Sequence, residues 1–222
     1  MYEKKCILWT TIGRKILLAL SGLALFFFLI FHLLGNLTLF MKNPDIFNQY
    51  ARTLENMGIL LYIAEGILIL TFLVHIVDAI LVTLENRKAR SMPYYKEADA
   101  GKPSHKSLAS KTMIYTGILV LIFMILHIKM FKFASSPACC GSKERNLYLI
   151  VSQAFTDPTI VAGYCLALIV LGFHLRHAFF SAFQSLGISH PRYTPYLDKL
   201  GIFLAVLIAG GFLSIPIWFF IR

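Results

Sequence analysis

Charged residues are scarce in this chain of 222 residues. Only 14% are Asp, Glu, Lys or Arg, whereas 58% are hydrophobic and the mean hydropathy is +0.71. A soluble globular domain has about 25% charged residues. The shortage of charge therefore argues against a soluble fold and indicates a protein of the lipid bilayer.

Cysteines are few and scattered, since Cys6, Cys139, Cys140 and Cys165 include no CxxC pair. A zinc site, an iron–sulfur ligand set and a c-type haem attachment each need a more regular spacing. We expect no function based on cysteine, and the sequence leaves the redox state of Cys139 and Cys140 open.

Acidic residues are also few, with 11 Asp and Glu against 21 Lys and Arg and a formal net charge of +10. The cations lie mostly between apolar runs, where they orient a membrane protein, so we expect no nucleic-acid partner. Arg14, Lys15 and the cations of 85–111 are expected to bind lipid headgroups, with docking of a soluble partner as the alternative.

Five apolar runs have the length of a membrane-spanning helix. They fall at about 15–40, 58–84, 112–131, 160–183 and 199–221, and a span needs about 20 apolar residues. The first run follows basic residues as a signal peptide does, but it is too long and lacks an A-x-A-like exit, so we expect a retained helix. The prediction is one all-α integral membrane domain over 1–222, a bundle of five transmembrane helices.

The distribution of Lys and Arg predicts the orientation of this bundle. Thirteen of them lie before the first run, between the second and third, or between the fourth and fifth, and seven lie at the opposite helix ends. The positive-inside rule then places the amino terminus in the cytoplasm and the carboxyl terminus outside.

Five of the seven histidines fall inside apolar runs: His32, His75, His127, His174 and His177. The other two, His105 and His190, lie in polar loops. An ionisable residue at membrane depth is a functional candidate, although a single buried histidine can equally serve a hydrogen bond between helices.

The depths of these histidines define two levels. His32 and His127 lie in the outer halves of outward-running helices, whereas His75 and His174 lie in the inner halves of inward-running helices. A rise of 1.5 Å per residue puts the two levels roughly 14 Å apart. Two pairs of imidazoles from different helices are what two bis-histidine haems require.

An internal repeat supports the same pairs. The pattern [ST]-G-x9-H occurs once before His32 and once before His127, and the offsets between equivalent histidines are 95 and 99 residues. The two halves therefore resemble a duplicated helix pair. Equivalent helices of such a repeat face one another, which pairs His32 with His127 and His75 with His174.

The residues that open the repeated pattern lie three turns from its histidine, at the level of the other pair. We expect Gly22 and Gly117 to let a porphyrin approach the backbone, and the hydroxyls of Ser21 and Thr116 to bond its propionates or edge. Ordinary packing of small residues is the alternative. By the same count Ala64 and Gly163 would leave room for the outer haem.

Two further residues at depth carry separate hypotheses. His177 lies at i+3 from His174; the repeat selects His174 as ligand, so His177 with Arg176 is expected to bond a propionate or a quinone, or to be a plain interfacial residue. Glu65 is expected to take up or release protons at a quinone site, with a hydrogen bond across the bundle as the alternative.

The chain resembles a known family over nearly its whole length: the five-helix, dihaem cytochrome b membrane subunit of bacterial succinate dehydrogenases and fumarate reductases. The most specific segment is FHLRHAFFSAFQSLG at 173–187, supported by Phe31-His32, Val74-His75 and Thr116-Gly117 through His127. The resemblance implies two haem b groups, one held by His32 and His127 and one by His75 and His174, and it does not make His177 a ligand.

The resemblance also implies partners. These are a flavoprotein with FAD and an iron–sulfur protein on the cytoplasmic face of the bacterial inner membrane, and menaquinone or another quinone in the bilayer. Succinate chemistry would then lie on a partner subunit, with no catalytic residue for it in this chain. Some members carry a glutamate two residues before the last ligand for a proton path, and Gly172 here puts that path in doubt.

Two other functions remain as alternatives. One is the quinol-oxidising cytochrome b of a nitrate reductase, formate dehydrogenase or hydrogenase, which the segment SAFQSLG disfavours. The other is a haem-free transporter that moves protons with the histidines and Glu65. The sequence leaves open the direction of catalysis, the quinone, the haem potentials and whether the complexes form dimers.

Overall fold

The computed structural model describes residues 10–88, 108–134 and 145–222. Four residues named above, His105, Cys6, Cys139 and Cys140, lie outside these ranges. So do several of the cations counted for the orientation: Lys4, Lys5, Arg90, Lys96, Lys102, Lys106 and Lys143. Of the four cysteines, Cys165 is described, as a free thiol that is partly buried.

Five helices are long and apolar enough to cross a membrane. They are α1 (Thr11–Asn36), which continues as η2 (Leu37–Phe40); α3 (Ile59–Lys88); α4 (Leu108–His127), which continues as the π-helical η3 (Ile128–Lys132); α6 (Pro158–Ser185); and α7 (Thr194–Ile221). The described residues contain no strand. The prediction of an all-α, multi-pass membrane protein with five spans is confirmed.

Local capping fixes several of the helix ends. Thr10 accepts a hydrogen bond from the amide of Gly13 at 3.1 Å, so α1 begins four residues before the apolar run. Asp157 caps α6 through the amide of Thr159 at 2.7 Å. Gly187 adopts φ +79° after the last turn of α6, which lets the amide of Ile188 reach the carbonyl of Phe183 at 2.9 Å.

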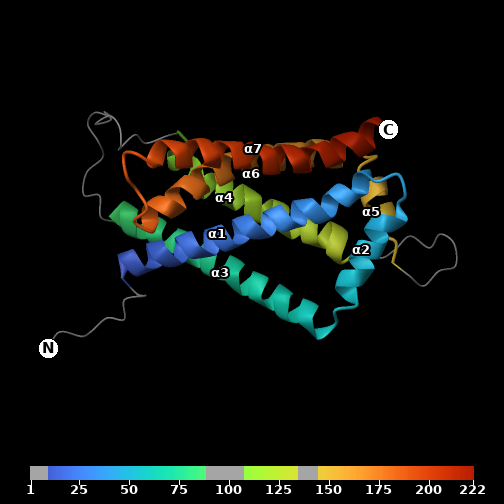
Figure 1. Ribbon diagram of the computed structural model, residues 1–222, viewed down its shortest axis with the longest axis horizontal. Coiled ribbons are helices and arrows are strands. Elements are labelled where there is room, and N and C mark those ends of the chain that lie inside the picture. Colours follow the sequence, from blue (N-terminus) through green and yellow to red (C-terminus); the bar gives the residue numbers. More distant parts are fainter. Residues whose placement is uncertain (1–9, 89–107, 135–144) are drawn as a thin grey trace.

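Two short helices lie between the apolar runs, where hydropathy predicts no spanning helix. They are α2 (Asp45–Glu55) and α5 (Leu147–Ala154). In α2 a single face is apolar and buries Phe47, while α5 buries Ile150 and Val151. Each is shorter than a membrane span, so a search for long apolar runs does not find it. The two helices lie together at one end of the bundle (Figure 1).

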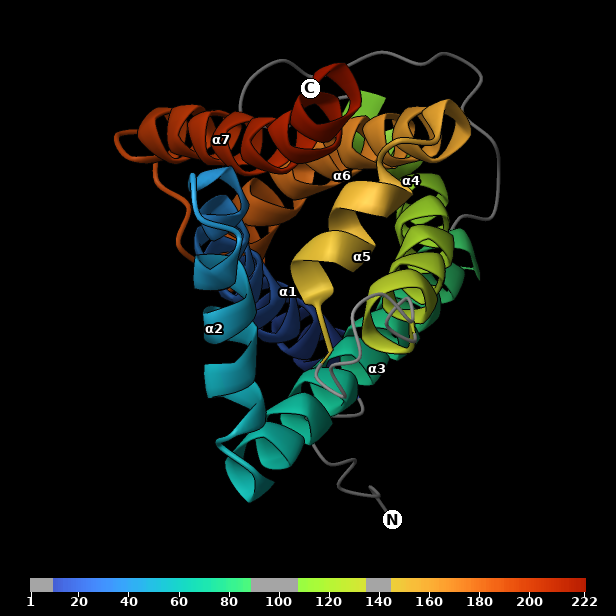
Figure 2. The same ribbon diagram turned by 90° about the vertical axis from the view of Figure 1, so that its right-hand side faces the viewer.

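The helix α6 lies at the centre of the bundle and packs against α1, α4 and α7. Its buried leucines join Phe26 of α1 and Ile208 of α7 in one core cluster, and a second cluster around Leu39, Phe155 and Tyr164 lies toward the end with α2 and α5. Figure 2 views the molecule from that end and shows α3 along one side.

The helix α3 packs mainly on α1, and its buried residues are only Asp78 and Val82 within the described chain. Large apolar side chains therefore cover its outward surface, with Ile59 69% and Tyr62 70% exposed. Such a surface is what a helix presents to lipid, where apolar side chains replace the polar coat of a soluble protein.

Candidate functional site

The structure brings His32 of α1 and His127 of α4 together. Their ring centroids are 5.9 Å apart and the ring planes are at 90°. Aromatic rings surround the pair: Phe28 and Phe212 contact His32 at 5.4 and 5.5 Å, and Phe123 and Phe131 contact His127 at 5.7 and 5.3 Å. Both imidazoles thus sit in an apolar environment.

His75 of α3 and His174 of α6 form the second pair. The ring centroids are 6.5 Å apart and the planes are at 73°. These are the two pairs that the internal repeat predicts. The proximity is therefore established from the structure, while ligation of iron by either pair stays a prediction.

A hydroxyl group lies beside Nδ1 of each ring in the His75–His174 pair. The Oγ1 atom of Thr116 is 3.1 Å from Nδ1 of His174, and the Oγ atom of Ser21 is 3.4 Å from Nδ1 of His75. A hydroxyl of α4 thus meets a histidine of α6 as a hydroxyl of α1 meets a histidine of α3. The equivalence of the two contacts agrees with a duplicated helix pair.

The His32–His127 pair has different neighbours at Nδ1. The side-chain amide nitrogen of Asn36 is 3.4 Å from Nδ1 of His32. It also donates to the backbone carbonyl of His32 at 2.8 Å. The hydroxyl of Tyr164, a buried residue of α6, is 3.3 Å from Nδ1 of His127. All four imidazoles therefore have a polar side chain of the protein at Nδ1.

Each pair of imidazoles would hold the metal of a cofactor that supplies its remaining ligands itself. Two imidazoles on one iron place their centroids about 6 Å apart, because each metal–nitrogen bond is about 2 Å long. The described residues contain no group of three or more His, Cys, Asp or Glu that could hold a bare metal ion. An acceptor at Nδ1 orients a metal-ligating histidine and leaves Nε2 for the metal, and the hydroxyl oxygens of Thr116 and Ser21 can be such acceptors.

The glycines of the repeated pattern face the imidazoles of the second pair. A Cβ atom on Gly22 would lie 3.2 Å from Cε1 of His75, and one on Gly117 would lie 3.5 Å from Cε1 of His174. These glycines therefore give room to the rings. Around Gly163 nothing lies within 4 Å of a built Cβ, and Ala64 is exposed.

His177 lies three residues after His174 on α6 and is partly buried, while its neighbour Arg176 is exposed. No hydrogen bond of His177 is seen among the described residues. His190 lies in the polar segment before α7, and its backbone carbonyl accepts a hydrogen bond from the hydroxyl of Thr194 at 2.8 Å. The role of His177 at a propionate or a quinone stays a prediction.

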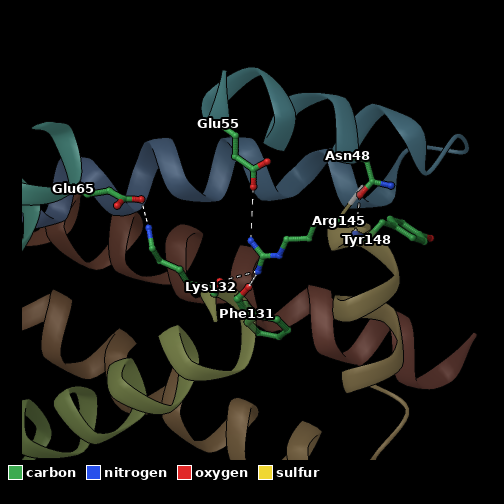
Figure 3. Close-up of polar contacts among 7 residues, drawn as sticks. All are labelled: Asn48, Glu55, Glu65, Phe131, Lys132, Arg145 and Tyr148. Carbon is green, nitrogen blue, oxygen red and sulfur yellow. Dashed lines mark hydrogen bonds and ion pairs between the residues drawn. The ribbon is translucent and has the colours of Figure 1, made fainter. Parts of the chain in front are cut away.

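Glu65 forms an ion pair with Lys132 of η3 (Figure 3). Its carboxylate therefore reaches across from α3 to the π-helical turn that follows His127. The side chains are 32% and 46% exposed, respectively, so the pair is not sealed in the bundle. The sequence places Glu65 at depth in its helix but contains no signal for Lys132 as its partner.

Arg145 ties the same region to the short helices. Its guanidinium donates to the carbonyls of Phe131 and, at 3.0 Å, Lys132, and lies 3.7 Å from the carboxylate of Glu55 on α2 (Figure 3). The last carbonyls of a helix have no partner within it, so a cation there completes the end of η3.

The hydroxyl–imidazole contacts were not predicted from the sequence, which assigned Ser21 and Thr116 to the propionates or edge of a haem. The [ST]-G repeat and its matching depth indicate that these hydroxyls lie at the level of the His75–His174 pair. The choice between an imidazole and a propionate depends on the rotation of each helix, which spacing alone does not fix. Tyr164 and Asn36 had no signal beyond their helical position.

Comparison with known proteins adds nothing to this site, because no protein-family model, curated protein or solved structure matches the chain.

Proposed function

We propose that the chain is the membrane-anchor cytochrome b subunit of a succinate:quinone oxidoreductase, a succinate dehydrogenase or fumarate reductase. It would relay electrons between an iron–sulfur subunit and a membrane quinone. The observation that carries the proposal is the pair of ring–ring contacts, His32 with His127 and His75 with His174, each between different spanning helices.

Each pair has the separation and surroundings that suit axial ligands of a b haem. The imidazoles lie between spanning helices, and at His174 and His75 a hydroxyl oxygen at Nδ1 can accept the ring N–H and leave Nε2 for the metal. A bound haem would supply one-electron chemistry. The apolar rings around His32 and His127 would keep water away from the iron.

The quinone is expected near the end that carries α2 and α5, where Glu65 can exchange protons with it. A carboxylate that is partly exposed and paired with one cation can accept or release a proton as the quinol forms or is oxidised. His177, with Arg176, is the second candidate for a propionate or quinone contact, at the opposite end of α6. The quinone class is menaquinone or another membrane quinone.

The membrane would be the bacterial inner membrane, with the amino terminus in the cytoplasm. The flavoprotein with FAD and the iron–sulfur subunit would dock on that side, beyond the His75–His174 pair. Arg14 of α1 lies at this end and is paired there with Glu85 of α3. Succinate itself would be handled by the flavoprotein, and lipid headgroups would meet the remaining cations.

The test is a spectrum of the purified membrane complex. A dithionite-reduced minus oxidised spectrum, with a pyridine haemochrome assay, counts b haems per polypeptide, and we expect two. Succinate-dependent quinone reduction or quinol-dependent fumarate reduction is then measured on the same sample.

The outcomes separate the alternatives. One haem would refute one of the histidine pairs. Two haems without turnover of succinate or fumarate would favour the cytochrome b of another quinol-oxidising complex. No haem would refute the proposal and favour a transporter.

A further inference from the structure

The hydroxyl of Thr116 is a hydrogen-bond donor within its own helix. It donates to the carbonyl of Met113 at 3.0 Å, in the preceding turn of α4. A hydroxyl has a single proton and two lone pairs. Toward Nδ1 of His174, 3.1 Å away, the oxygen can therefore act only as an acceptor. With the hydroxyl proton given to Met113, the proton of the neutral imidazole lies on Nδ1, which leaves the lone pair on Nε2.

Ser21 repeats this arrangement on α1. Its hydroxyl donates to the carbonyl of Leu17 at 2.8 Å and faces Nδ1 of His75 at 3.4 Å. The contact with the imidazole is longer than that of Thr116, so it is the weaker acceptor. His75 also has a hydrogen bond with the backbone of Leu18, so Ser21 shares the Nδ1 side of this ring with a second partner.

We propose that Thr116 and Ser21 are positioning residues that fix the tautomer of His174 and His75 and lower the reduction potential at that pair. This inference rests on the proposed function. An N–H group that donates to an oxygen makes the opposite ring nitrogen more basic. A more basic axial ligand stabilises ferric iron relative to ferrous iron, which lowers the potential of a one-electron couple.

The effect is confined to one pair, because the other pair lacks an equivalent acceptor. The nitrogen of Asn36 that faces His32 carries protons and has no lone pair to offer. The hydroxyl of Tyr164 lies 3.3 Å from Nδ1 of His127 and has only the weakly accepting sulfur of Met130, 3.6 Å away, for its own proton. Removing the Thr116 hydroxyl should therefore change one haem and not both.

The experiment is a redox titration of membranes that contain the whole complex, followed optically at the b haem bands. The variants are Thr116→Val, which keeps the shape and removes the hydroxyl; Thr116→Ser, which keeps the hydroxyl; and Ser21→Ala. The matched control is Thr71→Val, because Thr71 likewise donates to a carbonyl in its own helix, that of Ile67 at 2.8 Å. The haem missing from His174→Ala identifies the pair.

We expect Thr116→Val to keep both haems and to raise the midpoint potential of the haem identified by His174→Ala. Ser21→Ala should raise it less, and Thr116→Ser and Thr71→Val should leave both potentials as in the wild type. Loss of that haem in Thr116→Val, with retention in Thr116→Ser, would support the same role, because the hydroxyl would then be needed to present Nε2.

Unchanged potentials in both Thr116→Val and Ser21→Ala, with both haems retained, would overturn the inference and leave the proposed function intact. The inference also fails if Thr116→Ser behaves as Thr116→Val does, since the side chain would then act through packing. A wild-type complex without b haem would refute the proposed function, and this inference with it.

Discussion

Gly22 faces His75 so closely that a Cβ atom on the glycine would lie 3.2 Å from Cε1 of the imidazole. That approach is tighter than ordinary van der Waals contact, so the ring would have to shift by a few tenths of an ångström. At Gly117, the equivalent glycine of the repeat, the distance to the facing imidazole is an ordinary 3.5 Å. The two positions therefore have different tolerance for a methyl group.

We predict that Gly22→Ala lowers haem occupancy at the His75–His174 pair and that Gly117→Ala does so less. The added methyl would displace the His75 ring from its position beside His174. A pyridine haemochrome assay on purified complex measures the occupancy. Equal loss in both variants would contradict the difference in space at the two glycines.

Replacement of any one of His32, His127, His75 or His174 by alanine should remove one b haem and leave the other. A bis-histidine iron that loses an axial imidazole loses its low-spin state and much of its binding energy. His177→Ala is the matched control and should keep both haems. If His177→Ala loses a haem and His174→Ala does not, the assignment within α6 is reversed.

The ring planes predict the magnetic behaviour of the oxidised protein. If the imidazoles kept these interplanar angles, 90° and 73°, when holding a haem each, the iron dπ orbitals would lie close in energy. Both ferric haems should therefore give strongly anisotropic low-spin signals in electron paramagnetic resonance at low temperature. A rhombic signal of small anisotropy, as from parallel imidazole planes, would disagree with these angles.

Arg145→Gln should destabilise the protein by about 1–3 kcal/mol, because it removes a charged donor from two terminal carbonyls of η3. Thermal unfolding in detergent measures the change. Lys42→Gln, which changes an exposed cation shortly before α2, is the comparison variant and should have a smaller effect. An unchanged midpoint for Arg145→Gln would mean that lipid or water can replace the guanidinium.

Glu65→Gln should keep both haems and lower quinone turnover by about a hundredfold or more, the usual contribution of an acid–base group. Its ion pair with Lys132 is partly exposed and contributes only about 0–1 kcal/mol, so the fold should persist. Glu55→Gln, which loses a similar ion pair, is the control and should keep its activity. Full activity of Glu65→Gln would refute proton exchange by Glu65 and leave the ion pair with Lys132 as its role.

The five spans could be predicted because each is a continuous apolar run, and a run of this length has one stable solution in a bilayer. The ends were less well placed, since capping by Thr10 and Asp157 extends α1 and α6 beyond the apolar residues. The short helix α2 was missed although Phe47 and its neighbours have helical spacing. A hydropathy profile detects only helices long enough to cross the membrane, whereas α2 is short and lies at one end of the bundle.

The pairs of histidines could be predicted because the repeat relates them by symmetry, and symmetry determines which helices face one another. The partners at Nδ1 could not. Whether Thr116 meets His174 or a propionate depends on a rotation of α4 by a fraction of a turn. Tyr164 and Asn36 lie outside the repeated pattern, so the sequence offered no second copy with which to compare them.

One buried residue of α2 has a consequence for the order in which the protein assembles. Asn48 is 4% exposed; its amide donates to Asn146 at 3.0 Å and its carbonyl oxygen accepts from the amide of Tyr148 at 3.0 Å (Figure 3). Asn146 and Tyr148 lie 98 and 100 residues after Asn48 in the chain. Spanning helices insert before they associate. The junction of α2 with α5 therefore closes only after α4 and α5 have been synthesised, and a truncated chain that ends after α3 would leave the side-chain amide of Asn48 to hydrogen-bond with water.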